Sequence, residues 1–564
     1  MDRVEAETIV VAATVNKLAK FGSTHPSMTF QVTFWTIALC GLVNARAFAK
    51  ETIMLPMRDR VKLATDVHRP VGTNSLPVIL GRTPYNKNGL DGIGAEAVKR
   101  GFILVAQDCR GRFASEGENL PFNLDGPDGF DTLEWIAKQP WCNGRIGTWG
   151  GSAGAITQFQ MIATGTDKIS AQHLTVGAPN LYEVVYINGA FRKALVEDWL
   201  RGAQWGSNAL PRWVAHPIYD DYWRERDASL DYRKANAPAL HIGGYWDIFA
   251  QGTIDAFVGY QERGGRNARG KQRLVMGPWT HGVLQDKAGQ LKFPNGAKPP
   301  GAVDDAWQWF DRTLKSNTSN INTEPAVTYY VIGDVSDPKA PGNVWRTSEQ
   351  WPPVKATSTK YFLHNSHSLS TSTPGADDSL AYTYDPSNPA PTVGGIQLSI
   401  PAGPMDQKAV EDRPDVLVFT SAPVTIPIEV TGRVRAQLWI SADVPDTDFI
   451  ARLCDVYPDG RSFNLCEGAV RTRFRESGGR EAFLHPGKVY PIDVDLWSTS
   501  VIFNSGHRVR LQITSSSAPG YDPNPNTGAP FRANSETRKA NIKLYLDSQR
   551  PSHVVLPIFI EPKP

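Results

Sequence analysis

The sequence contains few cysteines and no hydrophobic run long enough to cross a bilayer. Five cysteines occur among 564 residues, and none belongs to a paired zinc-binding motif. The chain also lacks an internal repeat, a P-loop, a dinucleotide-binding fingerprint and any block of like charge. Its 59 Lys and Arg balance 57 Asp and Glu to a net charge of +2. We therefore expect neither nucleic acid nor a membrane as a partner.

The composition is that of a large globular protein. Hydrophobic residues make up 41% of the chain and charged residues 21%, and the length suggests two to four domains with ample core. The nearest metal candidate, His364 with His367, lies in a Ser/Thr-rich stretch that favours a solvated loop. We expect no metal and no organic cofactor.

The first 49 residues resemble a secretory signal. Phe34 to Val43 is a ten-residue apolar run, and Ala47-Phe-Ala49 is a small-residue cleavage pattern. A true start at Met28 would give a normal length, although no basic residue separates Met28 from the run. A lipid anchor at Cys40 is disfavoured by the leucine before it. We expect cleavage near Ala49 and a secreted or periplasmic protein; the alternative is an apolar N-terminal helix on a cytoplasmic enzyme.

The most informative stretch is Gly150-Gly-Ser-Ala-Gly154. It follows a short strand pattern ending at Trp149 and precedes Ala155 to Ala163, which can form a helix. A strand-turn-helix elbow of this kind exposes a serine hydroxyl as a nucleophile, and the glycines let strand and helix approach closely. The motif alone could be a glycine-rich turn, since the chain has 49 glycines.

Two downstream loops supply the partners that such a serine needs. Asp247 follows the strand pattern at 238–243, and His281 follows the one at 272–277. The order Ser, Asp, His, each on a loop after a strand, is that of a hydrolase triad. The rival histidines His173, His216 and His241 are less suitable, because His241 lies inside a strand pattern and the other two follow no strand-to-loop transition. Alone, Asp247 could be a helix N-cap and His281 an ordinary loop histidine.

At this point the chain resembles the α/β-hydrolase esterases and acylases related to cocaine esterase, glutaryl-cephalosporin acylases, α-amino-acid ester hydrolases and Xaa-Pro dipeptidyl peptidases. The resemblance runs from Glu51 to the C-terminus. Besides the three triad segments, its motifs are Met57-Arg-Asp59, Thr65-Asp66, Arg82-Thr-Pro-Tyr85, Gln107-Asp-Cys-Arg-Gly111, Ser115-Glu-Gly-Glu118, Asp131-Thr-Leu-Glu-Trp135, Trp141-Cys-Asn-Gly144, Pro445-Asp-Thr-Asp-Phe449, Asp455-Val-Tyr-Pro-Asp-Gly460 and Asn526-Thr-Gly528.

The resemblance implies Ser152, Asp247 and His281 as the triad. It also implies that Tyr85 lends its hydroxyl, and Ala153 its backbone N–H, to an oxyanion hole. One departure is Arg60, which stands where relatives have a glycine in the turn. The sequence therefore does not decide how tightly the first hairpin turns.

The expected fold is α/β: an α/β-hydrolase domain with a helical cap insertion, followed by an all-β sandwich that the resemblance specifies as a jelly roll. The expected boundaries are 1–49 for the signal peptide or extension, 50–180 and 236–322 for the hydrolase domain, 181–235 for the cap and 323–564 for the β domain. Period-2 runs from Val327 onward support that last domain. Most cap aromatics are expected to form its core.

Cysteine positions allow one disulfide. Cys454 and Cys466 flank the turn Tyr457-Pro-Asp-Gly460, so they fall nearly opposite each other on a predicted hairpin. Cys109 and Cys142 fall at opposite ends of the predicted sheet, and we expect both to be free and packed.

The sequence therefore predicts a serine hydrolase that cleaves small-molecule esters or amides through an acyl-enzyme. α-Amino-acid ester hydrolases carry acidic residues two and three positions after the triad aspartate; here those positions are Phe249 and Ala250, with Ile248 before them, so we expect neutral, apolar acyl groups to be preferred. The alternatives are an α-amino-acid ester hydrolase, with Glu183 or Glu197 supplying charge, an Xaa-Pro dipeptidyl peptidase, or an inert glycan-binding protein. Homo-oligomer formation stays open.

Overall fold

The computed structural model describes residues 48–72, 75–315, 324–353, 356–376, 378–476 and 480–559. The predicted signal segment lies outside these ranges except for Phe48 and Ala49, which begin the first strand. Within the described ranges, every helix is too short or too polar to traverse a bilayer.

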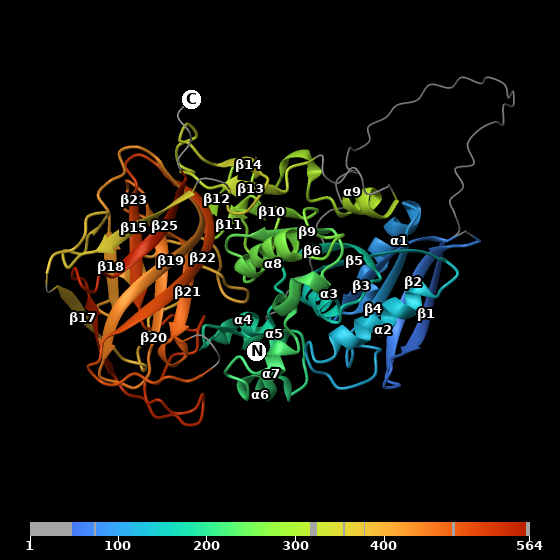
Figure 1. The fold of residues 1–564 in the computed structure, drawn as a ribbon, viewed down its shortest axis with the longest axis horizontal. Helices are drawn as coiled ribbons and strands as arrows, with labels where there is room; N and C mark the ends of the chain where they lie inside the picture. The colour runs from blue at the N-terminus through green and yellow to red at the C-terminus, as the bar shows by residue number, and fades with distance from the viewer. Residues whose placement is uncertain are drawn as a thin grey trace, which may run out of the picture. The chain divides into compact units, whose positions relative to one another are not determined.

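A ten-stranded sheet forms the N-terminal part of the fold (Figure 1). Its order is β1-β2-β4-β3-β5-β6-β9-β10-β13-β14. The strands are β1 (Phe48–Pro56), β2 (Lys62–Pro70), β3 (Leu76–Thr83), β4 (Ile103–Asp108), β5 (Cys142–Gly151), β6 (Ile169–Thr175), β9 (Ala239–Gly244), β10 (Arg273–Gly277), β13 (Val327–Val331) and β14 (Val344–Ser348). From β4 to β13 neighbouring strands are parallel, so the loops after β5, β9 and β10 leave the same edge.

Helices cover both faces of this sheet. Val78 and Leu80 of β3 pack with α2 (Asp125–Ala137), α3 (Ala153–Ala163) and α8 (Ala250–Arg263). Ile79, between them, packs on the opposite face with α1 (Asp91–Lys99) and α9 (Ala306–Phe310). Alternate strand residues thus supply two separate cores, as the two-residue period of a strand requires.

A helical insertion separates β6 from β9. It contains α4 (Leu181–Val185), the strand pair β7 (Tyr186–Ile187) and β8 (Ala190–Phe191), α5 (Lys193–Gly202), α6 (Ala209–Val214) and α7 (Asp221–Arg224). These helices form one group beside α8 in Figure 1. Trp213 and Trp223 are buried in its core, whereas Trp199, Trp205, Tyr219 and Tyr222 are only partly buried against it.

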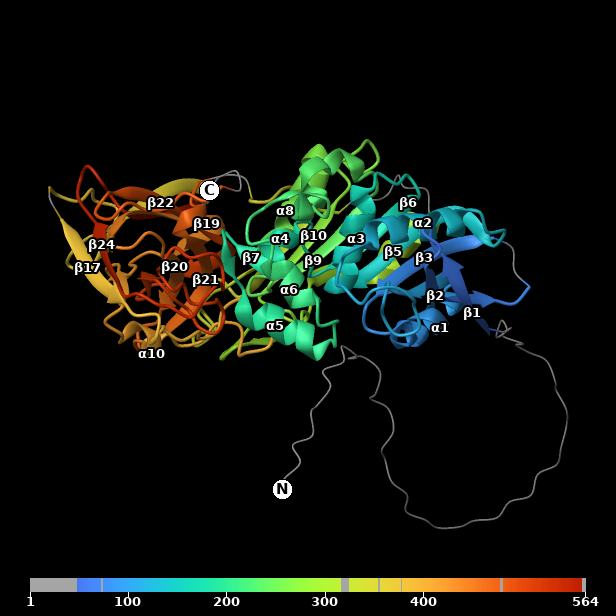
Figure 2. The same ribbon diagram turned by 90° about the horizontal axis from the view of Figure 1, so that it is seen from below.

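The C-terminal part is an all-β domain of two sheets. The seven-stranded sheet has the order β16-β15-β25-β19-β24-β17, with β22 paired to β19, and the four-stranded sheet has the order β18-β23-β20-β21. The strands are β15 (Ala356–Leu363), β16 (Leu369–Ser370), β17 (Ser379–Tyr384), β18 (Val416–Thr420), β19 (Ile428–Ala442), β20 (Asp448–Val456), β21 (Ser462–Arg471), β22 (Tyr490–Phe503), β23 (Arg508–Thr514), β24 (Ala540–Tyr545) and β25 (His553–Phe559). Figure 2 shows β19 and β22 in one layer and β20 and β21 in the other.

The ten-stranded sheet ends later than the boundary expected at residue 322. Strands β13 and β14 extend that sheet, with β13 parallel to β10, and only then does the chain enter the β domain. A short apolar run fits either a buried strand of a parallel sheet or a core strand of a sandwich, so the sequence pattern does not say which sheet the strand joins.

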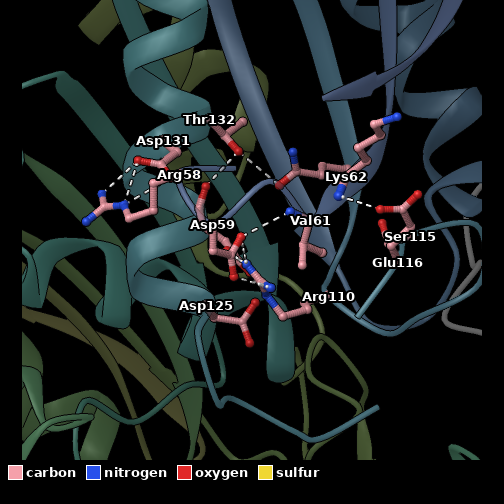
Figure 3. A network of polar contacts seen from close by, with 12 residues as sticks. Arg58, Asp59, Val61, Lys62, Arg110, Ser115, Glu116, Asp125, Asp131 and Thr132 are labelled. Carbon is pink, nitrogen blue, oxygen red and sulfur yellow. Dashed lines mark hydrogen bonds and ion pairs between the residues drawn. The ribbon is translucent and has the colours of Figure 1, made fainter. Parts of the chain in front are cut away.

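The first hairpin is closed in spite of Arg60. Arg60 adopts a left-handed φ of 71°, and its N–H donates to the carbonyl of Met57 at 2.8 Å. Ion pairs hold the turn from both sides: Arg58 with Asp131 of α2, and Asp59 with Arg110 (Figure 3). Side-chain contacts therefore oppose the strain that glycine would avoid.

The disulfide that the sequence allowed between Cys454 and Cys466 is absent. Both Cys454 and Cys466 are free and buried. A shift in the β20–β21 register places Cys454 opposite Asn464 and Cys466 opposite Leu453. Because adjacent strand residues point to opposite faces, the two thiols lie on different sides of the sheet. Cys109 and Cys142 are also free, as predicted; Cys109 is buried and Cys142 half-buried.

Candidate functional site

Ser152 lies at a sharp turn between β5 and α3. Its backbone adopts φ 55° and ψ −123°, a conformation that is strained for any residue with a side chain. The Ser152 N–H donates to the carbonyl of Thr175 at the end of β6 (2.9 Å), and its carbonyl accepts from the N–H of Ala155. The turn is thus held by the neighbouring strand and by the helix it begins, as predicted for a nucleophile elbow.

A continuous hydrogen-bonded chain joins the three predicted residues. The His281 Nε2 atom lies 2.9 Å from Ser152 Oγ, and His281 Nδ1 lies 2.6 Å from Asp247 Oδ2. The Asp247 side chain is fully buried, whereas the His281 side chain is 18% exposed. The other carboxylate oxygen of Asp247 accepts from the backbone N–H of Phe249 at 2.8 Å. Both oxygens of the buried charge therefore have donors.

The loops that carry Asp247 and His281 are joined by their backbones. The Tyr245 N–H donates to the Gly277 carbonyl, and the Trp246 N–H to the Trp279 carbonyl. The indole N–H of Trp246 reaches the carbonyl of Asn464 in the C-terminal domain at 3.1 Å. These bonds fix the separation of acid and histidine before any substrate binds.

Tyr85 follows β3 and presents its hydroxyl beside Ser152. The Trp199 indole N–H donates to this hydroxyl at 2.8 Å, which leaves the phenolic proton free to be donated. Burial of the hydroxyl end raises the pKa of Tyr85, and hydrogen bonds with Trp199 and Ser152 act against that rise. The residue as a whole is 44% exposed.

Ala153 is the first residue of α3 and is buried. A first-turn N–H has no acceptor within its own helix, and the helix N-terminus carries partial positive charge. The Ala153 N–H thus directly follows Ser152 in the chain, and the Tyr85 hydroxyl lies near the Ser152 side chain.

An apolar pocket adjoins Ser152. It is a small hollow of about 30 Å³ that is partly open to solvent. Its walls come from α3, the helical insertion, the loop after Asp247 and the C-terminal domain: Phe122, Ser152, Ala153, Ile156, Val184, Leu195, Val196, Trp199, Trp213, Ile248, Phe249 and Leu398. Apart from Ser152 and the Trp indole N–H groups, these side chains are hydrocarbon. A larger hollow at the far end of β10, near Arg273, is remote from His281.

The two carboxylates named as alternatives do not line this pocket. Glu183 lines a separate surface hollow with Asp255 and Arg433. Glu197 pairs with Lys193 and with Arg532 of the C-terminal domain, at 2.7 and 2.6 Å. Among the residues that the structure describes, none that lines the pocket is acidic.

The other candidate histidines are buried or have hydrogen-bond partners other than Ser152. His241 is fully buried as predicted, and burial lowers its pKa to about 3. Burial likewise lowers the pKa of His173 to about 4. His216 pairs with Asp220 at 2.6 Å within the insertion. His364 contacts Ser370 in a loop.

One acidic cluster has the spacing of a metal site within the described ranges: Asp66, His68 and Asp91. Lys50 pairs with both carboxylates and Lys87 with Asp66, so lysine ammonium groups occupy the positions that a cation would take.

Several pocket residues carry no sequence signal. Leu398 comes from the C-terminal domain, far along the chain from Ser152, and Val184, Leu195 and Val196 are ordinary helix apolar residues. Their role depends on how the insertion and the C-terminal domain pack, which a single sequence does not reveal.

The chain is similar to known proteins over most of its length. The chain matches the family model for the X-Pro dipeptidyl-peptidase (S15 family) over residues 59–210 and 200–283. It matches the model for the X-Pro dipeptidyl-peptidase C-terminal non-catalytic domain over 319–555. It is 32% identical to cocaine esterase from a Rhodococcus species, over 92% of this chain and all of the relative.

Two solved structures share the fold over nearly the whole chain. One is an aminopeptidase from a marine-sediment Thaumarchaeota archaeon (TM-score 0.76, 25% identity, covering 91% of this chain and 97% of the other). The second is an α-amino acid ester hydrolase (TM-score 0.74, 24% identity, covering 93% and 98%).

The elbow predicts that its two leading glycines differ in tolerance. A Cβ on Gly150 would lie 2.6 Å from the Gly154 carbonyl oxygen, whereas a Cβ on Gly151 meets nothing closer than 3.4 Å. Gly150→Ala should lower the stability by about 1–3 kcal/mol through overpacking and displace Ser152. Gly151→Ala, the matched control, should leave melting temperature and activity nearly unchanged. Equal behaviour of the two variants would contradict the close strand–helix contact.

Proposed function

Since this chain belongs to the X-Pro dipeptidyl-peptidase (S15) family of serine hydrolases, we propose that it cleaves carboxylic esters or amides through an acyl-enzyme on Ser152. The observation that carries the proposal is the hydrogen-bonded chain from Ser152 through His281 to Asp247. The helical insertion would then act as a cap over the acyl pocket, and the C-terminal domain would be the family's jelly roll.

The proposed reaction has two halves. Ser152 Oγ attacks the substrate carbonyl while His281 Nε2 accepts its proton, and buried Asp247 orients the ring and stabilises the imidazolium. His281 then protonates the leaving alcohol or amine, which departs and leaves the acyl group on Ser152. In the second half His281 takes a proton from water, the water attacks the ester, and Ser152 recovers its proton.

The developing oxyanion has two donors within reach of Ser152. The Tyr85 hydroxyl already accepts from Trp199, so its own proton can point at the oxyanion. The Ala153 N–H adds the positive end of α3. Preorganised donors of this kind stabilise the charge that forms only in the transition state.

The lining of the pocket supports a preference for neutral acyl groups. An ammonium on the acyl group would lose water among Leu195, Ile248 and Phe249 with no carboxylate beside it. Glu183 lines a separate hollow, and Glu197 is paired with Lys193 and Arg532. Cocaine esterase, the relative at 32% identity, is by its name an esterase, which favours esters over peptides.

The second candidate is cleavage of α-aminoacyl esters or amides. It rests on the likeness to the aminopeptidase from the Thaumarchaeota archaeon. The apolar wall at Ile248 and Phe249 argues against it. An inert binding protein is disfavoured by the assembled Ser–His–Asp contacts.

Replacing the nucleophile tests the reaction class. Ser152→Ala should lower kcat on a p-nitrophenyl ester by about 10⁶ without loss of folding, as removal of the serine does in other triads. Wild type should react covalently with a fluorophosphonate and Ser152→Ala should not, while Ser366→Ala, in an exposed loop, should label normally. More than a few per cent residual activity would reveal another nucleophile.

Removing one oxyanion donor tests the role of Tyr85. Tyr85→Phe should lower kcat roughly 10²- to 10³-fold with KM little changed, because the lost bond forms mainly in the transition state. The control is Tyr182→Phe, which removes a hydroxyl bound to the Pro217 carbonyl within the insertion. That variant should change stability more than kcat. An effect of Tyr85→Phe confined to KM would assign Tyr85 to substrate binding instead.

Paired substrates test the acyl preference. A phenylacetyl ester should exceed the phenylglycyl ester of the same alcohol by at least about tenfold in kcat/KM, roughly 1.4 kcal/mol of transition-state binding. The comparison should be made at a pH low enough to keep the phenylglycyl amine charged. Faster turnover of the phenylglycyl ester would contradict this preference and support an α-amino-acid ester hydrolase instead.

A further inference from the structure

Arg192 is a buried cation at the N-terminus of α5. The residue is only 3% exposed. Its guanidinium donates to three backbone carbonyls: Ile248 at 2.9 Å, Val184 at 3.4 Å and Ile396 at 3.4 Å. These carbonyls belong to three different parts of the fold, namely the loop after Asp247, the helical insertion and the C-terminal domain.

The guanidinium has no carboxylate within 4.0 Å among the described residues. Burial lowers the pKa of Arg192, yet an arginine stays charged at any physiological pH. An unpaired charge in this position is costly, because carbonyl dipoles and the Trp497 ring, 5.8 Å away, replace its water only in part. Such a charge calls for an anion at longer range.

Three groups face Arg192 electrostatically: Tyr521, Asp247 and Glu467. Burial raises the pKa of Tyr521, so its phenol stays neutral. Glu467 is already paired with Arg452 at 2.7 Å. Asp247 is the remaining carboxylate, and its hydrogen-bond partners are His281 and the Phe249 N–H. The positive charge of Arg192 is thus balanced most directly by the acid of the proposed triad.

The same contacts fix geometry. Ile248, whose carbonyl Arg192 binds, stands between Asp247 and the Phe249 N–H that donates to the Asp247 carboxylate. On the other side, α5 carries Leu195 and Val196 of the acyl pocket. One side chain therefore links the acid loop, the pocket wall and the C-terminal domain.

We propose that Arg192 is a positioning residue for the triad acid: its guanidinium clamps the loop after Asp247 against the insertion and the C-terminal domain, and so places a fixed positive charge beside that loop. The proposal rests on the proposed function. It predicts two separable effects, one of geometry and one of charge.

The charge effect is read from the pH profile of kcat/KM. Without the cation, an imidazolium beside Asp247 is more stable, so the acidic limb of the profile should move to higher pH. Arg192→Met should move the acidic limb of the kcat/KM profile to a pH about 0.5–1 unit higher. It should also lower kcat about 10- to 100-fold and change KM by less than about threefold. Arg192→Lys keeps the charge, so its limb should stay near that of wild type.

The geometric effect is read from kcat of Arg192→Lys. A lysine ammonium has a single nitrogen, whereas the guanidinium reaches these carbonyls from two separate nitrogens, so kcat should fall about tenfold. If Arg192→Met does not fold, this variant decides the matter, because a wild-type kcat in Arg192→Lys overturns the clamp.

Asn188→Gly serves as the uncharged control. Asn188 also links the insertion to the C-terminal domain, through its Nδ2 atom and the Ala469 carbonyl at 3.1 Å, and its φ of 44° suits glycine. This variant should lose some stability and keep the wild-type limb. A folded Arg192→Met with an unshifted limb, or an equal shift in Asn188→Gly, would refute the charge role.

Fluorophosphonate labelling of wild type separates this proposal from the proposed function. Absence of labelling at Ser152 would reject the serine mechanism itself. Normal labelling together with wild-type kinetics in both Arg192 variants would reject the role of Arg192 alone.

Discussion

The hydrogen bond between His281 and the fully buried carboxylate of Asp247 is the interaction on which the site depends. A carboxylate without water needs donors on both oxygens, and here they are the imidazole and the Phe249 N–H. That requirement dictates the surroundings. The acid loop is bonded to the histidine loop, which sets the position of the imidazole against Ser152.

The C-terminal β domain takes part in the site, although its family model is described as non-catalytic. Leu398 forms part of the pocket wall, the Asn464 carbonyl binds Trp246, and the Ile396 carbonyl binds Arg192. None of these groups could do chemistry. Their contribution is to close part of the pocket and to hold the loop after Asp247, so this domain bears on the proposed site by position.

The predictable part of the site was the part encoded by local pattern. A strand, a glycine-flanked serine and a helix can be recognised from adjacent residues. The strand-to-loop transitions that precede Asp247 and His281 can be recognised in the same way. Because parallel strands send their following loops to one edge, three such loops in the right order converge. The errors had a different origin. The free thiols of Cys454 and Cys466 follow from a register shift, and the late end of the ten-stranded sheet follows from a strand pairing, neither of which leaves a mark in composition.

By itself the sequence determined the α/β class, the order of the proposed triad and the family to which the chain belongs, because each rests on short-range pattern or on motifs in register. Only the tertiary structure decided which side chains enclose the pocket and where buried charges are balanced. Arg192 illustrates the reason. In the sequence it is one arginine near a helix start, whereas in the fold its guanidinium meets carbonyls of residues 184, 248 and 396. Contacts between residues so far apart in the chain form only when whole domains pack together, so a local sequence pattern does not reveal them.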